Sequence, residues 1–147
     1  MMMKKLIILF AFLSLSSVFG QRGSNEKIKA LKTAHITDAL DLTPAEAEKF
    51  WPVFNDYEER MQQLRKNERR EIMSVVRSGI NSLSEADANE VIDKMLEYKS
   101  LELEYQEELV NQLRKVISPQ KILRLRKAED DFRKMLVERL RHHKGKS

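Results

Sequence analysis

Along most of this chain apolar residues recur every three or four positions, which is the spacing of one face of an α-helix. Three helix-start signals divide the pattern. In the first, Thr43 suits an N-cap, Pro44 suits the first helical position, and Glu46 completes a capping box. Ser84 and Ser118 each begin a similar signal. The pattern therefore predicts four helices, at about Asn25 to Leu40, Pro44 to Ser78, Glu85 to Val116 and Pro119 to His142.

The residues between these signals are mostly good helix formers, such as Leu, Glu, Lys, Arg, Gln and Ala. Between Gly23 and Gly145 the one glycine is Gly79, at the expected end of the second helix. Because every segment shows helical spacing, strands are not expected. The sequence predicts an all-α fold of four long helices that forms a single domain over residues 21 to 147.

The second predicted helix carries one continuous apolar seam, which we expect to be its core face. Its members are Phe50, Phe54, Tyr57, Met61, Leu64, Ile72 and Val75.

The third predicted helix carries two apolar stripes, whereas a helix at the surface of a fold needs only one. The first stripe consists of Val91, Met95, Tyr98, Leu101, Tyr105, Leu109 and Leu113. The second repeats every seven residues on another face, at Leu96, Leu103, Val110 and Ile117. We expect this helix to be packed on two sides. The second side is covered either by another copy of the chain, in a homodimer, or by the second and fourth helices of the same chain.

The first twenty residues have the layout of a secretory signal peptide. Lys4 and Lys5 precede an apolar and hydroxyl run from Leu6 to Phe19, and Gly20 ends it ahead of a polar stretch. This run has 14 residues, whereas a membrane-spanning helix needs about 20. We predict cleavage after Gly20 and export, the alternative being an uncleaved N-terminal anchor.

Cleavage of this segment would change the net charge of the protein. The chain has 27 basic and 23 acidic residues, but positions 21 to 147 have 25 and 23, a net charge of +2. Residues 21 to 117 sum to −4, and residues 118 to 147 sum to +6. An exported chain so close to neutral is not expected to bind nucleic acid. Its charge asymmetry favours attraction to an oppositely charged surface, or is the solvated face of a basic helix.

The residue types needed for catalysis are missing or dispersed. The chain has no cysteine, and its three histidines are not associated with a glycine-rich turn around a serine. Adjacent carboxylates such as Glu58 and Glu59 point to different sides of a helix and cannot converge on one substrate atom. We therefore expect neither an enzyme nor a bound cofactor.

Histidine remains a candidate metal ligand. His35 shares a helical face with apolar residues, so we expect a core histidine with satisfied hydrogen bonds. His142 and His143 lie at the end of the last helix, where a cation suits the helix dipole. No metal ligands are assigned.

Two segments of the chain resemble a known family. LTPAEAEKFWPVFNDYEER, from Leu42 to Arg60, and ISPQKILRLRKAEDDFRKML, from Ile117 to Leu136, are similar to the paired LTxxQ segments of the Spy and CpxP family of periplasmic helical proteins. The likeness is greatest to the Bacteroidetes branch described as sensors of extracytoplasmic-function sigma factors. The chain departs from the motif at Glu46, where the first copy would carry Gln, and at Ile117, Ser118 and Lys121 in the second copy.

The resemblance implies a hooked four-helix protomer, an antiparallel dimer with a curved cradle, and a periplasmic location. It also implies ATP-independent binding of unfolded or misfolded envelope proteins, through exposed apolar side chains framed by basic ones. For this role we predict contact residues on the second helix: Phe50, Trp51, Phe54, Met61, Arg65, Arg69, Met73 and Arg77. The alternative is a sensor that binds an envelope signalling protein of a sigma-factor pathway. One form of this alternative responds to metal, through His35 or the terminal histidine pair.

Overall fold

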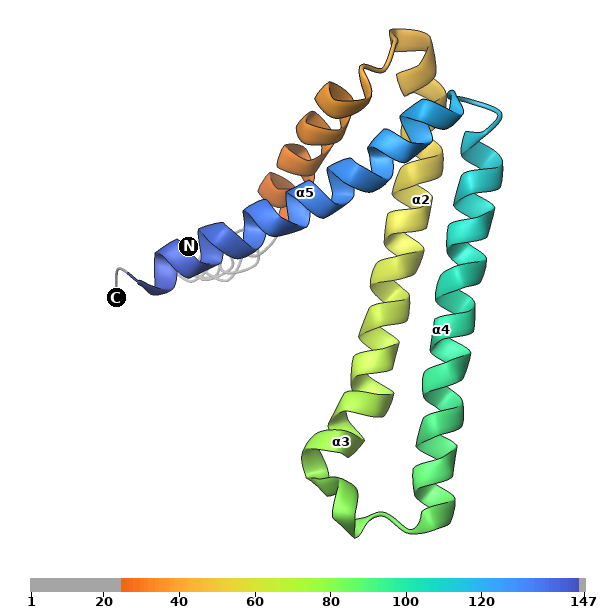
Figure 1. Cartoon of the computed structure of the whole chain (residues 1–147), viewed down its shortest axis with the longest axis vertical. Helices are drawn as coiled ribbons and strands as arrows, with labels where there is room; N and C mark the ends of the chain where they lie inside the picture. Colours follow the sequence, from red (N-terminus) through yellow and green to blue (C-terminus); the bar gives the residue numbers. More distant parts are fainter. Residues whose placement is uncertain (1–24, 146–147) are drawn as a thin grey trace, which may run out of the picture. The chain divides into compact units, whose positions relative to one another are not determined.

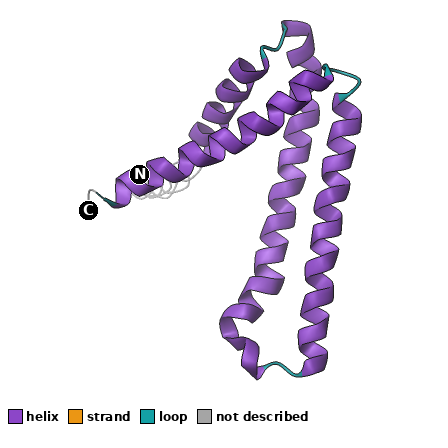
Figure 2. Ribbon diagram, viewed as in Figure 1, coloured by secondary structure: helices purple, strands orange, loops and turns teal. Residues whose placement is uncertain are grey.

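The computed structural model describes residues 25–145, which are helical except at short connections (Figure 1). The described part begins with a helix at 25–40. Next come α2 (Pro44–Glu68), a π-helical turn η1 (Arg69–Met73), α3 (Ser74–Gly79) and a 3₁₀ turn η2 (Ile80–Ser82). The remaining helices are α4 (Glu85–Leu113) and α5 (Pro119–Lys144). No strand occurs within residues 25–145 (Figure 2), so the predicted all-α fold of four long helices is confirmed there.

Each start signal caps a helix as its chemistry requires. The Thr43 hydroxyl accepts a hydrogen bond from the Glu46 N–H at 3.2 Å, and the Thr43 N–H donates to the Glu46 carboxylate at 3.1 Å. Ser84 and Ser118 accept from backbone N–H groups of the first turns of α4 and α5, at 3.1 and 3.3 Å. Local sequence therefore determines where these helices begin.

The chain divides into two compact units. The first combines residues 25–41 with the part of α5 from Arg124 onward, and the second is Leu42–Leu123. The single-domain expectation for residues 21 to 147 stays a prediction. The signal peptide expected at residues 1 to 20 lies outside the described part of the chain, and none of the described helices is long and apolar enough to cross a membrane.

The larger unit is an α-hairpin in which α2 and α4 run side by side in opposite directions (Figure 1). Its interior contains apolar residues from both arms: Phe50, Phe54, Met61, Leu64, Ile72, Leu109, Leu113 and Ile117. All of them belong to the apolar stripes seen in the sequence. The hairpin therefore results from one apolar face on each of two capped helices.

The closed end of the hairpin departs from the sequence expectation. We expected one helix from Pro44 to Ser78, but the helix widens into the π turn at Arg69–Met73 before α3 resumes. Gly79, at φ +121°, then ends α3 in a conformation that residues with a side chain rarely adopt. Helix-forming propensities do not distinguish α from π hydrogen bonding, so the sequence pattern could not reveal this turn.

In the smaller unit the helix at 25–40 packs on α5. The buried side chains are Ile36, Leu40, Leu125, Ala128 and Phe132. His35 lies beside Phe132 with ring centroids 5.8 Å apart, as expected for a histidine on an apolar face. Its Nε2 atom, however, is buried without a hydrogen-bond partner among residues 25–145, so the expectation of satisfied hydrogen bonds was wrong for this atom.

Candidate functional site: the surfaces of the α2–α4 hairpin

The eight predicted contact residues fall into two groups in the structure. Phe50, Phe54 and Met61 are buried, with at most 2% of their surface exposed, and Trp51 is half-buried. The remaining four are exposed: Arg65, Arg69, Met73 and Arg77. In this conformation the buried three cannot touch a bound protein, and the role of the whole set in binding stays a prediction.

The buried aromatic residues form a stack along the start of α2. The rings of Phe50 and Phe54 are stacked with centroids 5.3 Å apart, and Trp51 meets Phe50 edge-on at 4.9 Å. Tyr57 extends the row from Phe54 at 6.2 Å. Such ring pairs add stability beyond the burial of their area, so this part of α2 serves the hairpin core.

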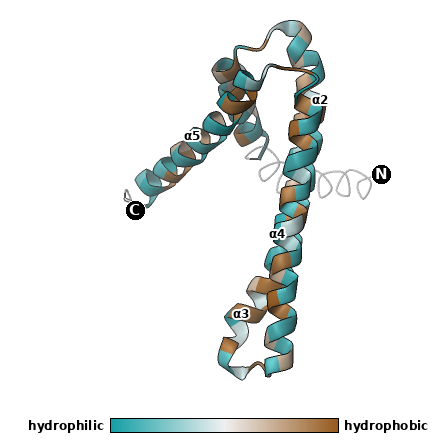
Figure 3. Ribbon diagram, turned by 45° about the vertical axis from the view of Figure 1, so that its right-hand side comes forward, coloured by the Kyte–Doolittle hydropathy of each residue, from teal (hydrophilic) through white to brown (hydrophobic). Residues whose placement is uncertain are grey.

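A mixed apolar and basic surface lies at the closed end of the hairpin. Its apolar members are Met73, Val76 and Ile80, which are 41%, 36% and 60% exposed. The exposed guanidinium groups of Arg69 and Arg77 come from the same short segment. In Figure 3 the ribbon around α3 includes brown, hydrophobic stretches. We refer to these five residues as the tip surface.

Sequence reasoning found only part of the tip surface. It predicted Arg69, Met73 and Arg77 but missed Val76 and Ile80, because the seam was extended at α-helical spacing as far as Val75. Across the π turn Ile72 stays buried and Val75 half-buried, so the predicted seam is kept, and Val76 and Ile80 lie off it at the surface. The one available signal was Gly79, which marks the end of the helical pattern just beside these residues.

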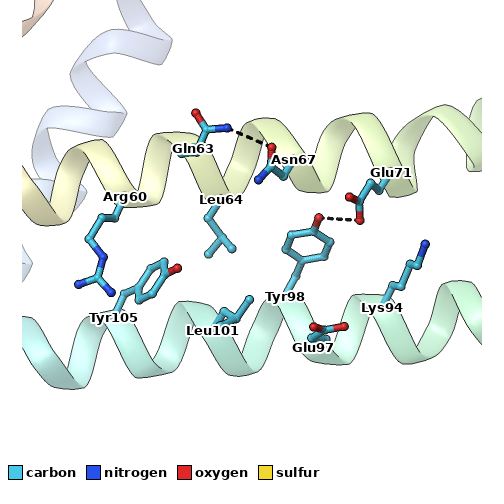
Figure 4. Close-up of a pocket in the computed structure, with 10 residues that line it drawn as sticks. All are labelled: Arg60, Gln63, Leu64, Asn67, Glu71, Lys94, Glu97, Tyr98, Leu101 and Tyr105. Carbon is cyan, nitrogen blue, oxygen red and sulfur yellow. Dashed lines mark hydrogen bonds between the residues drawn. The ribbon is translucent and has the colours of Figure 1, made fainter.

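Nearer the middle of the hairpin, α2 and α4 enclose a groove of about 390 Å³ (Figure 4). Leu64, Leu101, Tyr98 and Tyr105 supply its apolar and aromatic lining. Its polar lining consists of Arg60, Gln63, Asn67, Glu71, Lys94 and Glu97. The charged side chains of the lining balance, two basic against two acidic, so the groove has no preference for a ligand of one sign.

Polar contacts join the two arms at both ends of this groove. The Arg60 guanidinium donates to the Glu108 carboxylate at 2.6 Å and stacks over the Tyr105 ring at 4.1 Å. This hydrogen bond raises the pKa of Arg60. At the other end the Tyr98 hydroxyl donates to Glu71, in the π turn, at 2.8 Å, which raises the pKa of Tyr98 (Figure 4). These contacts fix the register of α2 against α4.

The two motif-like segments also touch one another. Lys121 donates to the Glu46 carboxylate at 2.7 Å, and the two side chains are about one-fifth exposed. First the Lys121 ammonium and then the Thr43 N–H hold the pKa of the Glu46 carboxyl below its ordinary value of 4.5. Glu46 and Lys121 are both positions at which this chain departs from the LTxxQ pattern. The two departures thus complement each other in a single ion pair.

This ion pair predicts a specific acid sensitivity. A carboxyl whose pKa is lowered by folding stabilises the folded state above its unfolded pKa, and that contribution is lost as the pH falls through the folded pKa. Glu46→Gln retains a capping-box side chain but removes the charge. Below about pH 4.5 the variant should therefore lose less stability with falling pH than the wild type does, which thermal unfolding followed by circular dichroism measures.

Glu48→Gln, at an exposed position of the same helix, is the matched control and should keep the wild-type acid profile. The paired variant Glu46→Gln with Lys121→Gln tests the contact itself. Its stability should depend on pH as weakly as that of the single variant, and it should fold with the same helix content. Identical acid profiles for the wild type and Glu46→Gln would contradict the assigned role of the pair.

A different surface is formed by the second stripe of α4. Leu96 and Leu103 are 64% and 56% exposed, and Val110 is half-buried. The last member, Ile117, is buried beyond the end of α4. A shallow depression of about 350 Å³ follows the stripe between Leu103 and Arg114. Within the larger unit α2 does not cover Leu96 and Leu103, so the alternative that the second helix covers this stripe is wrong for these two residues.

Within residues 25–145, no group of three or more His, Asp or Glu side chains is arranged so that it could hold a metal ion. The metal-responsive sensor stays a prediction. Comparison of the chain with family models, curated proteins and solved structures finds no match. The surfaces of the α2–α4 hairpin therefore provide the basis for assigning a function.

Proposed function

We propose that this protein is an exported, ATP-independent binding protein of Spy and CpxP type that holds unfolded or misfolded polypeptides at its tip surface. The observation that carries the proposal is the combination of three exposed apolar side chains with two arginines on one short segment. Exposed apolar groups bind the apolar segments of an unfolded chain, and the arginines attract its acidic residues.

The local backbone suits such a role. The tip surface spans the π turn, α3 and the 3₁₀ turn, three short elements in place of one regular helix. Methionine, at position 73, is unbranched and adapts to differently shaped partners. A surface of this kind favours loose binding to many sequences rather than tight binding to one.

Aggregation of a reduced, unfolding client protein, followed by light scattering, tests the proposal. The purified protein should suppress aggregation at equimolar concentration or below, and less well at high salt because salt screens the arginines. Arg69→Glu with Arg77→Glu should raise the concentration needed for half-protection at least about fivefold, since reversing two attractive charges costs on the order of 1 kcal/mol or more. Met73→Ser with Ile80→Ser should weaken protection without changing its salt dependence.

Arg133→Glu with Lys134→Glu, on α5, carries the same change of charge and should protect like the wild type. No protection at a several-fold excess of wild-type protein would refute the proposed function. If the tip-surface variants protect as well as the wild type, the client-binding site lies elsewhere on the chain.

We further propose that the protein is a homodimer joined through the second stripe of α4. Leu96, Leu103 and Val110 follow the seven-residue repeat typical of paired helices, and on Leu96 and Leu103 more than half of the surface is exposed. In an antiparallel pair centred on Leu103, Leu96 of each copy lies opposite Val110 of the other. The apolar stripe would then be covered by an identical stripe.

The family resemblance supports a periplasmic location and the antiparallel arrangement as parts of the same proposal. The direct contact between Glu46 and Lys121 adds a structural argument, because it joins the two segments on which the resemblance depends. The first segment and the start of the second, as far as Leu123, lie in one unit, which is the arrangement expected if the two are a functional pair.

A further inference from the structure

The last turns of α5 carry a surface that neither the proposed client binding nor the proposed dimer uses. Residues 133, 137, 140 and 144 are spaced by four, three and four, so they share one face of the helix. They are Arg133, Val137, Leu140 and Lys144, and Lys134 and Arg141 lie in the adjoining row. We refer to these six residues as the basic face of α5.

The basic face is exposed throughout. Val137 and Leu140 are 45% and 64% exposed, and the four basic residues are exposed as well. The buried side of the same helix is formed by Leu125, Ala128 and Phe132, which precede this face along the chain. The apolar residues of the basic face are therefore not part of the core of the described structure.

Little acidic charge is available on α5 to neutralise this face. Between residues 133 and 144 the helix has five basic residues and one acidic residue, Glu138. The acidic pair Asp130 and Asp131 lies just before the face; these carboxylates contact Arg126 and Lys127 at 4.0 and 2.8 Å, and Asp131 also attracts Lys134 of the face. Glu138 lies beside the face and reduces its charge without cancelling it. A strongly positive strip with two apolar side chains in its middle results.

From these observations we infer that the basic face of α5 binds the surface of an anionic lipid bilayer. The helix lies along the interface with Val137 and Leu140 turned toward the acyl boundary, and the long stems of the basic residues let their charges reach lipid phosphates. The charge pattern favours a lipid surface over an acidic polypeptide, because two neighbouring apolar side chains lie between basic groups on one straight face. Binding of this kind is peripheral and reversible.

Vesicle flotation with the exported protein tests the inference, using phosphatidylglycerol mixed with phosphatidylcholine and, for comparison, phosphatidylcholine alone. The wild type should bind the anionic vesicles and lose most of that binding at high salt. Arg133→Gln, Lys134→Gln and Arg141→Gln together should lower the partition coefficient at least roughly tenfold, because each basic residue near an anionic surface contributes severalfold. Neutral glutamines keep α5 helical, which circular dichroism can verify.

The matched control is Arg65→Gln with Arg69→Gln and Arg77→Gln on the hairpin, which should bind anionic vesicles like the wild type. Val137→Ser with Leu140→Ser should weaken binding at both low and high salt. Equal binding of the α5 triple variant and the wild type, or equal binding to both vesicle types, would overturn the inference. Client protection provides the separate readout: the α5 variants should retain it, and the hairpin variants should weaken it, so the two proposals can fail independently.

Discussion

Glutamate at both Leu96 and Leu103 should convert the protein from a dimer to a monomer. Each substitution places a carboxylate in an apolar stripe, and a symmetric dimer would have to accommodate four of them. α4 already has nine acidic and two basic residues, so the added charges also meet like charge. Burying even one unpaired charge is strongly unfavourable, and the dissociation constant should rise by roughly a thousandfold or more.

Sedimentation velocity across a concentration series measures this effect directly. Ile80→Glu with Leu123→Glu makes the same chemical change at positions that are 60% and 72% exposed but lie off the stripe, so this variant should remain dimeric. Leu96→Ser with Leu103→Ser adds no charge and should weaken the dimer less. A wild-type protein that is monomeric at every concentration, or a glutamate variant that dimerises as tightly as the wild type, would contradict the proposed interface.

Replacing Phe54 with alanine should destabilise the protein by about 3–5 kcal/mol, the usual effect of removing a buried phenylalanine ring. Phe54 is 2% exposed, and its ring contacts those of Phe50, Trp51 and Tyr57. The alanine leaves a cavity within this row and removes three ring contacts. Chemical unfolding followed by circular dichroism gives the change in free energy, and the thermal midpoint should fall by more than about 10 °C.

Asn55→Ala, at the next and exposed position of α2, is the matched control and should change the stability by less than about 1 kcal/mol. The same pair of variants separates a core role from the client-contact role that the sequence suggested for Phe54. If Phe54 is a core residue, the main effect of Phe54→Ala is a lower free energy of unfolding. A client contact would lower protection against aggregation while leaving stability near that of the wild type, and that result would contradict the burial seen in the structure.

The positions of the helices could be predicted closely because they depend on local chemistry. The predicted starts at Pro44, Glu85 and Pro119 coincide with those observed, since each depends on a cap within three or four residues. The end of the second helix near Ser78 was also predictable from Gly79. The π turn was not, because a change from α to π hydrogen bonding has no marker in the spacing of apolar residues before it.

The candidate site was only partly predictable for a related reason. Phe50, Phe54 and Met61 were expected to contact clients, yet they are the side chains on which the hairpin core is built. An apolar residue at helical spacing looks the same in a sequence whether it faces a neighbouring helix or a bound protein. Arg65, Arg69 and Arg77 were easier to place, because an unpaired guanidinium group is rarely buried.

The sequence by itself determined that this protein is a set of long capped helices with two apolar stripes on α4 and a basic final helix. These properties follow from residue spacing and from contacts within one turn. Only the tertiary structure decided which stripe α2 covers, that Glu46 meets Lys121 across 75 positions, and that Val76 and Ile80 face outward at the closed end of the hairpin. The physical reason is that burial depends on how two helix faces match along their whole length, and that match is a property of the folded pair rather than of either segment.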